Sequence, residues 1–194
     1  MSVDPAAPRS PPPNAPEVEA AYEAASELEV AEILDGELHL FPRPRATHAR
    51  AASRLGRVLG PYDDDTGPSG WILLDEPELH LGPRPDKMVP DLAGWRRERM
   101  PEMPDVAAFT LPPDWVCEIL SDRTEAIDRS KKMRIYRREG VKHCWLINPV
   151  QQTLELYRLT NGQWLHVETY EGDMRLRVEP FESVEIDMSA LWAR

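Results

Sequence analysis

The sequence has little cysteine: Cys117 and Cys144 are the only two in 194 residues. Two thiols cannot form a disulfide framework or a four-thiolate zinc site, which excludes a disulfide-rich secreted scaffold and favours a reducing cytoplasm. No apolar run approaches the ~20 residues that a membrane-spanning helix needs. The chain also lacks an opening basic segment followed by an apolar stretch, the pattern of a secretory signal. We therefore expect a cytoplasmic protein with no membrane contact.

Positive charge is also in short supply, because 23 Lys and Arg stand against 34 Asp and Glu for a formal net charge of −11. A protein held to nucleic acid mainly through phosphates usually has a basic surface. Residues 43–57 nonetheless contain five arginines and no acid, and residues 129–142 contain seven Lys or Arg against one acid. A nucleic-acid role would therefore depend on a local site or a bound cation. Candidate phosphate contacts are Arg43, Arg45, Arg50 and Arg129.

The distribution of proline divides the chain in two. Residues 1–16 hold six of the twenty prolines and almost no large apolar side chain, which predicts a flexible leader. Residues 17–194 are long enough to bury one core and are predicted to form a single domain. Strand and helix patterns alternate in the middle of this region, and hairpin patterns flank them. This order predicts an α/β (α+β) fold with a mixed sheet flanked by helices.

Local signals place several elements within that domain. Asp35-Gly36 and Asn161-Gly162 are dipeptides that tolerate positive φ, so each predicts a tight hairpin turn. Residues 47–60 predict a helix with Thr47 as its cap, and residues 124–138 predict a second helix. The compact apolar run 115–120 predicts a central strand covered on both faces.

Two acids break the apolar pattern of predicted strands. Glu118 lies inside the run 115–120, where an unpartnered carboxylate would be costly, so it must protonate, pair with a base or bind a metal. Asp91 follows Val89-Pro90 at the start of another short apolar strand, a position where proline marks a strand entrance or a bulge. Asp91 alone is typical of a turn, and Glu118 alone is compatible with an ion pair. On neighbouring strands, however, the two would offer hard oxygen ligands to Mg²⁺ or Mn²⁺.

Lys132 is the third exception. At ~100° per residue it falls inside the apolar arc of the predicted helix, whereas Lys131 falls on the polar side. A lysine on a core-facing stripe either extends its stem to solvent or meets a buried acid. Asp128, one turn earlier, is placed to contact it.

These residues lie in segments whose order resembles the Uma-type restriction endonuclease family of bacteria, part of the PD-(D/E)xK nuclease superfamily. The resemblance extends from about Val30 to about Leu159. The segments are EILDG (32–36), VPDLA (89–93), PDWVCEILS (113–121), DRSKKMRIYRREGV (128–141) and WLINP (145–149).

The resemblance implies a restriction-endonuclease-like fold and metal-dependent hydrolysis of DNA by Asp91, Glu118 and a lysine, with Mg²⁺ or Mn²⁺ as cofactor. The plain superfamily motif has its lysine two positions after the glutamate, where this chain has Leu120. The family's lysine instead matches Lys132 or, as the alternative, Lys131. Recurring family positions also match a second tier of candidates. These are Glu32, Glu78 and His48.

Other interpretations stay open at this stage. A protein that keeps the nuclease fold but acts only as a binding or assembly module would suit the acidic total. A zinc site built on Cys117, His143 and Cys144 is disfavoured because no CxxC or HxxxH spacing is present. Trp95, close to Asp91, is the one tryptophan placed for substrate contact. A homodimer is expected, because symmetric dimers are common and duplex cleavage needs two active sites.

Overall fold

The structure, a computed structural model, describes residues 13–63 and 70–193. Its strands are β1 (Glu29–Leu34), β2 (Glu37–Pro42), β3 (Trp71–Asp75), β4 (Leu79–Leu81), β5 (Asp86–Met88), β6 (Leu92–Arg96), β7 (Trp115–Ile119), β8 (His143–Asn148), β9 (Thr153–Thr160), β10 (Gln163–Glu171), β11 (Arg175–Leu176) and β12 (Ile186–Asp187). Its helices are α1 (Pro16–Glu23), α2 (Ala46–Leu59), α3 (Glu125–Ile127), α4 (Met133–Glu139) and α5 (Ser189–Trp192), with a 3-10 turn η1 (Gly60–Tyr62) and a π-helical turn η2 (Asp128–Lys132).

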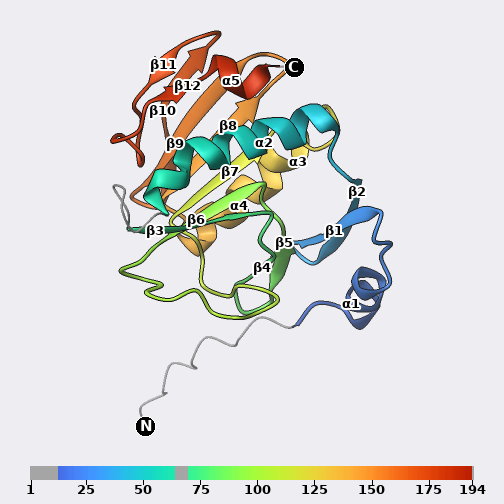
Figure 1. Ribbon diagram of the computed structural model, residues 1–194. Coiled ribbons are helices and arrows are strands. Elements are labelled where there is room, and N and C mark those ends of the chain that lie inside the picture. Colours follow the sequence, from blue (N-terminus) through green and yellow to red (C-terminus); the bar gives the residue numbers. More distant parts are fainter. Residues whose placement is uncertain (1–12, 64–69, 194) are drawn as a thin grey trace.

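A six-stranded sheet forms the centre, in the order β10-β9-β8-β7-β6-β3. β7 and β8 run parallel, joined by the helical segment α3–η2–α4, and the other neighbours are antiparallel. A four-stranded antiparallel sheet, β2-β1-β5-β4, lies next to it, with α1 beyond β1 (Figure 1). The mixed sheet and flanking helices confirm the predicted fold class.

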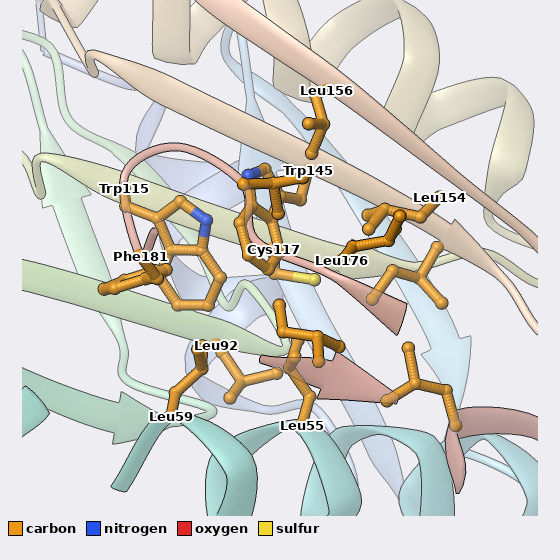
Figure 2. Packing of buried hydrophobic residues seen from close by; sticks show 14 of the residues in the cluster. Leu55, Leu59, Leu92, Trp115, Cys117, Trp145, Leu154, Leu156, Leu176 and Phe181 are labelled. Carbon is orange, nitrogen blue, oxygen red and sulfur yellow. The ribbon is translucent and has the colours of Figure 1, made fainter. Parts of the chain in front are cut away.

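The two faces of β7 look into two different cores. Trp115, Cys117 and Ile119 face α2 and the C-terminal segment, where Phe181 lies among four aromatic rings. Figure 2 shows Phe181 in this core with Trp115 and Trp145. Val116 faces α4 and the strands of the smaller sheet. Because side chains alternate along a strand, Glu118 must point to the α4 face.

Several local predictions are confirmed and others are corrected. Asp35-Gly36 and Asn161-Gly162 form hairpin turns with positive φ at both residues, as type I′ turns require. Thr47 is not the cap of α2, because the helix begins one residue earlier and Arg45 precedes it. Trp95 is fully buried and donates to the Leu111 carbonyl, so it is a core residue and not a substrate contact.

The predicted flexible leader falls mostly outside the described residues. Within the described part, Asn14 is buried and its amide donates to Glu19 Oε1 and to the Pro85 carbonyl, both at 2.9 Å. None of the described helices combines the length and the apolar character that crossing a bilayer requires.

Candidate functional site

Strand register brings the two predicted carboxylates together. Leu92 on β6 pairs with Cys117 on β7, so the next step in this antiparallel register sets Asp91 opposite Glu118. Asp91 Oδ2 also accepts a hydrogen bond from the Ile119 backbone N–H at 2.5 Å. The two acids, 27 positions apart in the chain, therefore lie side by side at one edge of the central sheet.

Lys132 reaches the same point from the helical side. Its Nζ lies 3.1 Å from Glu118 Oε2, 3.1 Å from Glu32 Oε1 and 3.6 Å from Asp128 Oδ1. It also donates to the Val89 carbonyl at 3.2 Å. The Lys132 side chain is only 5% exposed, so its ammonium contacts three carboxylates and does not reach solvent.

The two neighbouring lysines lie in a π-helical turn and make different contacts. The predicted continuous helix 124–138 is interrupted over Asp128–Lys132, where the Met133 N–H bonds to the Asp128 carbonyl five residues back. Such turns are rare and occur often at functional sites. Asp128 and Lys132 both point inward from this turn, whereas Lys131 pairs with Glu37, whose side chain is 69% exposed. Of the two lysines left open by the sequence, Lys132 therefore lies beside the carboxylates.

Tyr136 is a contact that sequence reasoning missed. Its hydroxyl donates to Glu118 Oε1 at 2.5 Å, so Glu118 receives Lys132 on one oxygen and Tyr136 on the other. Tyr136 lies on the apolar arc of the helix, and that position alone accounts for it as a core residue. The available signal was its spacing, because a tyrosine one turn after an inward lysine places its hydroxyl near the same partner.

The second-tier candidates take different positions. Glu32 on β1 bonds both Lys132 and the Val89 N–H, the latter at 2.8 Å, and so belongs to the buried cluster. His48, in the first turn of α2, has its Nε2 3.3 Å from Asp91 Oδ1. Glu78 stands apart from Lys132: its Oε1 accepts from the Tyr22 hydroxyl at 2.8 Å and lies 2.6 Å from His80 Nε2.

Burial and charge act against each other at this cluster. Burial alone would lower the pKa of Lys132, but Glu118, Glu32 and Asp128 outweigh it and raise that pKa well above its ordinary value. Burial likewise would lower the pKa of His48, and the hydrogen bond and charge of Asp91 raise it overall. Lys132 is therefore a charged donor at neutral pH.

Asp128→Asn should remove part of the pH dependence of stability. Burial, only partly offset by Lys132, raises the pKa of Asp128 from 3.8 to about 6. The native state then binds more protons than the unfolded state between about pH 4 and 6. This contribution to stability is present below that window and is lost as the pH rises through it.

Urea titrations across this pH range test the assignment. The free energy of unfolding of the wild type should fall more steeply with rising pH than that of Asp128→Asn. Asp122→Asn, a change at an exposed aspartate of the same connection, should follow the wild type. Parallel curves for the wild type and Asp128→Asn would show that Asp128 does not titrate in this window.

A pocket of about 580 Å³ gives access to the cluster. Its floor includes Asp91, Glu118 and Lys132, and its walls come from α1, the β1–β2 hairpin and the start of α2. Among residues 13–63 and 70–193, no three His, Cys, Asp or Glu side chains converge as a ready-made metal cage. Mg²⁺ seldom uses such a cage, since it usually keeps several waters and takes one or two protein carboxylates.

The donor set fits a divalent cation on two grounds. Each ionised carboxylate oxygen has two lone pairs, so the contacts from Lys132 and Tyr136 leave Glu118 with acceptor capacity, and Asp91 lines the open pocket. More carboxyl groups than cationic side chains also meet here, and burial raises the pKa of Glu118 well above its usual value although the charge of Lys132 opposes the rise. The carboxylates are Glu32, Asp91, Glu118 and Asp128, against Lys132 and His48. A bound cation would offset that excess.

A mixed sheet that presents two carboxylates and an inward lysine at one edge defines a restriction-endonuclease-like architecture. The comparisons agree: residues 17–189 match the model of the family described as "Uma2: Putative restriction endonuclease", and the chain belongs to this family. No curated protein matches the chain. Among solved structures, the chain is similar to a putative nuclease belonging to DUF820 from Anabaena variabilis ATCC 29413. The TM-score is 0.72 at 21% identity, covering 90% of this chain and 96% of the other.

Proposed function

We propose that this protein is an endonuclease that hydrolyses phosphodiester bonds of DNA with the help of Mg²⁺ or Mn²⁺. The observation that carries the proposal is the convergence of Asp91, Glu118 and the buried ammonium of Lys132 on the floor of one pocket. Membership of the restriction endonuclease family supports it. The charge excess of the cluster supports the need for a cation.

Each residue has a distinct part in this reaction. Asp91 and Glu118 would hold the cation, with the Ile119 carbonyl as a further oxygen ligand. When bound, the cation supplies charge stabilisation for the phosphate and lowers the pKa of water. Lys132 stays protonated, so it acts as a donor that orients the attacking water and stabilises negative charge on phosphorus oxygens, not as a base. Tyr136, Glu32 and Asp128 are positioning residues for Glu118 and Lys132.

The reaction needs only water as its second reactant. A water oxygen forms a bond to phosphorus, and the bond from phosphorus to the leaving sugar oxygen breaks. The water gives up one proton and the leaving oxygen gains one. The charged Lys132 ammonium, held by Glu118 and Glu32, keeps its proton throughout.

Removal of the cation tests the proposal. Purified protein should cleave a mixture of circular single-stranded and circular duplex DNA with Mg²⁺ or Mn²⁺ and lose all cleavage in excess EDTA. Calorimetry should show Mn²⁺ binding to the DNA-free protein. Cleavage of both DNAs unaffected by EDTA would exclude the cation from the reaction.

A nuclease-fold protein that only binds or assembles is the second candidate, favoured by the net charge of −11. It predicts neither cleavage nor Mn²⁺ binding in the same assays.

A homodimer stays a prediction, and sedimentation of the full chain tests it.

A further inference from the structure

The depth of the carboxylates limits which DNA can reach them. Glu118 and Glu32 are each 2% exposed, and Lys132 is 4% exposed, at the floor of the 580 Å³ pocket. That volume lies in the ~300–1,000 Å³ range of pockets that enclose small-molecule ligands, room for about one or two nucleotides. A scissile phosphate must therefore leave the surface of its duplex and enter the pocket.

A continuous duplex resists this movement. Its bases are paired and stacked, and DNA is stiff over ~50 nm, so pushing one backbone into a narrow pocket requires local unpairing or sharp bending. Enzymes whose reacting atoms lie in such pockets act on single strands or extrude a nucleotide. A single strand meets neither barrier.

The walls of the pocket carry two fixed aromatic rings. Tyr22 of α1 and Phe41 of β2 both line it and are half-buried. Lys87 Nζ lies 4.5 Å from the centre of the Tyr22 ring. The Phe41 ring stacks on the His39 ring, with 6.1 Å between the ring centres and an angle of 7° between the ring planes. Rings held in this way offer stacking surfaces for unpaired bases, the feature that single-strand binding sites share.

Unpaired arginines accompany the rings. Arg45, just before α2, and Arg123, between β7 and α3, both line the pocket and are exposed. Neither forms an ion pair or a side-chain hydrogen bond within residues 13–63 and 70–193. Most arginines elsewhere in the described structure are tied to acids or carbonyls, as Arg129 is to Glu155. These two free guanidinium groups at the pocket are therefore available to bind phosphates.

We propose that the pocket takes single-stranded DNA, or a strand end separated from a duplex, and rejects a continuous duplex. The part of this inference that concerns cleavage rests on the proposed nuclease function. The part that concerns DNA binding does not depend on it. A single strand is cut at one active site, so the inference does not require a homodimer.

Cleavage of two closed circles tests the preference. With Mn²⁺, a single-stranded DNA circle should be cut at least tenfold faster than a relaxed duplex circle of the same sequence. Equal or faster cutting of the duplex circle overturns the inference and leaves the proposed nuclease function intact. Closed circles have no ends, so any cutting is internal.

Binding without chemistry separates the two proposals. In Ca²⁺, the fluorescence anisotropy of a labelled 20-nucleotide strand should report binding at least tenfold tighter than that of its duplex. If this holds while neither circle is cut, the nuclease function fails and the substrate inference stands. If neither DNA binds and neither is cut, both fail.

Variants of the walls locate the binding. Phe41→Ala should weaken single-strand binding by about tenfold, whereas Phe41→Tyr should restore it, because stacking needs a ring and not a particular one. Arg45→Gln should weaken single-strand binding. It should also reduce the slope of log affinity against log salt concentration by about 1, the change expected for the loss of one phosphate contact. Arg175→Gln, an exposed arginine on β11 outside the pocket, is the matched control and should change neither. Unchanged binding by both Phe41→Ala and Arg45→Gln would place the DNA elsewhere.

Discussion

Lys132→Met should cost about 3–5 kcal/mol of stability at pH 8 and abolish cleavage. The ammonium is the common partner of Glu118, Glu32 and Asp128, and removing one side of a buried ion pair leaves uncompensated charge. Methionine keeps most of the volume, so the loss reflects charge rather than a cavity. Urea titration measures the first effect, and cleavage of DNA with Mn²⁺ measures the second.

The destabilisation should depend on pH with a defined sign. Burial already raises the pKa values of Glu118 and Asp128, and Lys132 opposes that rise. Without the ammonium both values rise further, and the native state of the variant binds more protons than its unfolded state. Its stability is therefore retained at low pH and lost as the pH rises. The difference from the wild type should be larger at pH 8 than at pH 5.

Lys131→Met is the matched control for this experiment. Lys131 is the adjacent lysine and pairs with Glu37, whose side chain is 69% exposed, and surface pairs of this kind contribute ~0–1 kcal/mol. We expect its stability to stay within about 1 kcal/mol of the wild type and its cleavage to be retained. A larger loss in Lys131→Met than in Lys132→Met would reverse the assignment of the two lysines.

Much of the central sheet and of the candidate site could be predicted from sequence because a few residues violate strong patterns. Glu118 is a charge in an apolar run, and a buried charge needs a partner whatever the fold. Lys132 lies on the apolar side of a helix, which left its ammonium two destinations, solvent or a buried acid, and the structure shows the second. The hairpin at Asp35-Gly36 was predictable because its backbone conformation has few alternatives.

The remaining features depend on tertiary context and left no comparable pattern. The π turn over Asp128–Lys132 adds one residue per turn locally, and helical periodicity assumes that no such addition occurs. Tyr136 fits the apolar stripe of its helix whether or not its hydroxyl has a hydrogen-bond partner. Trp95 is close to Asp91 in sequence, but it lies near the far end of β6, where its ring is fully buried against Phe109.

Helix α1 shows the same limit at the pocket wall. The helix extends from Pro16 to Glu23 and buries none of its residues, so no apolar stripe in its sequence indicates where it packs. Polar contacts such as Tyr22 to Glu78 and Lys87 to Glu19 hold it beside the pocket. Contacts between residues 56 or more positions apart cannot be read from local composition.

Asp91→Asn and Glu118→Gln should each reduce cleavage by about 10³-fold or more and weaken Mn²⁺ binding. Each change removes one negative charge from the pair that is proposed to hold the cation, and charge stabilisation by a metal contributes several kcal/mol to such reactions. The amide introduced by Asp91→Asn can still accept the Ile119 N–H through its carbonyl oxygen, so this variant should fold normally. Cleavage rates and Mn²⁺ calorimetry are the measurements.

Glu118→Gln carries an additional cost that separates charge from structure. Both Glu118 oxygens accept from buried donors, and an amide can accept on only one side, so either Lys132 or Tyr136 loses its partner. We expect a stability loss of about 1–3 kcal/mol for this variant, in contrast to Asp91→Asn. Glu78→Gln removes a carboxylate that lines the pocket but contacts Tyr22 instead of Lys132. It should change the cleavage rate by less than about tenfold. If Glu78→Gln lost as much Mn²⁺ binding as Asp91→Asn, the cation would have to lie toward the wall of the pocket and not between β6 and β7.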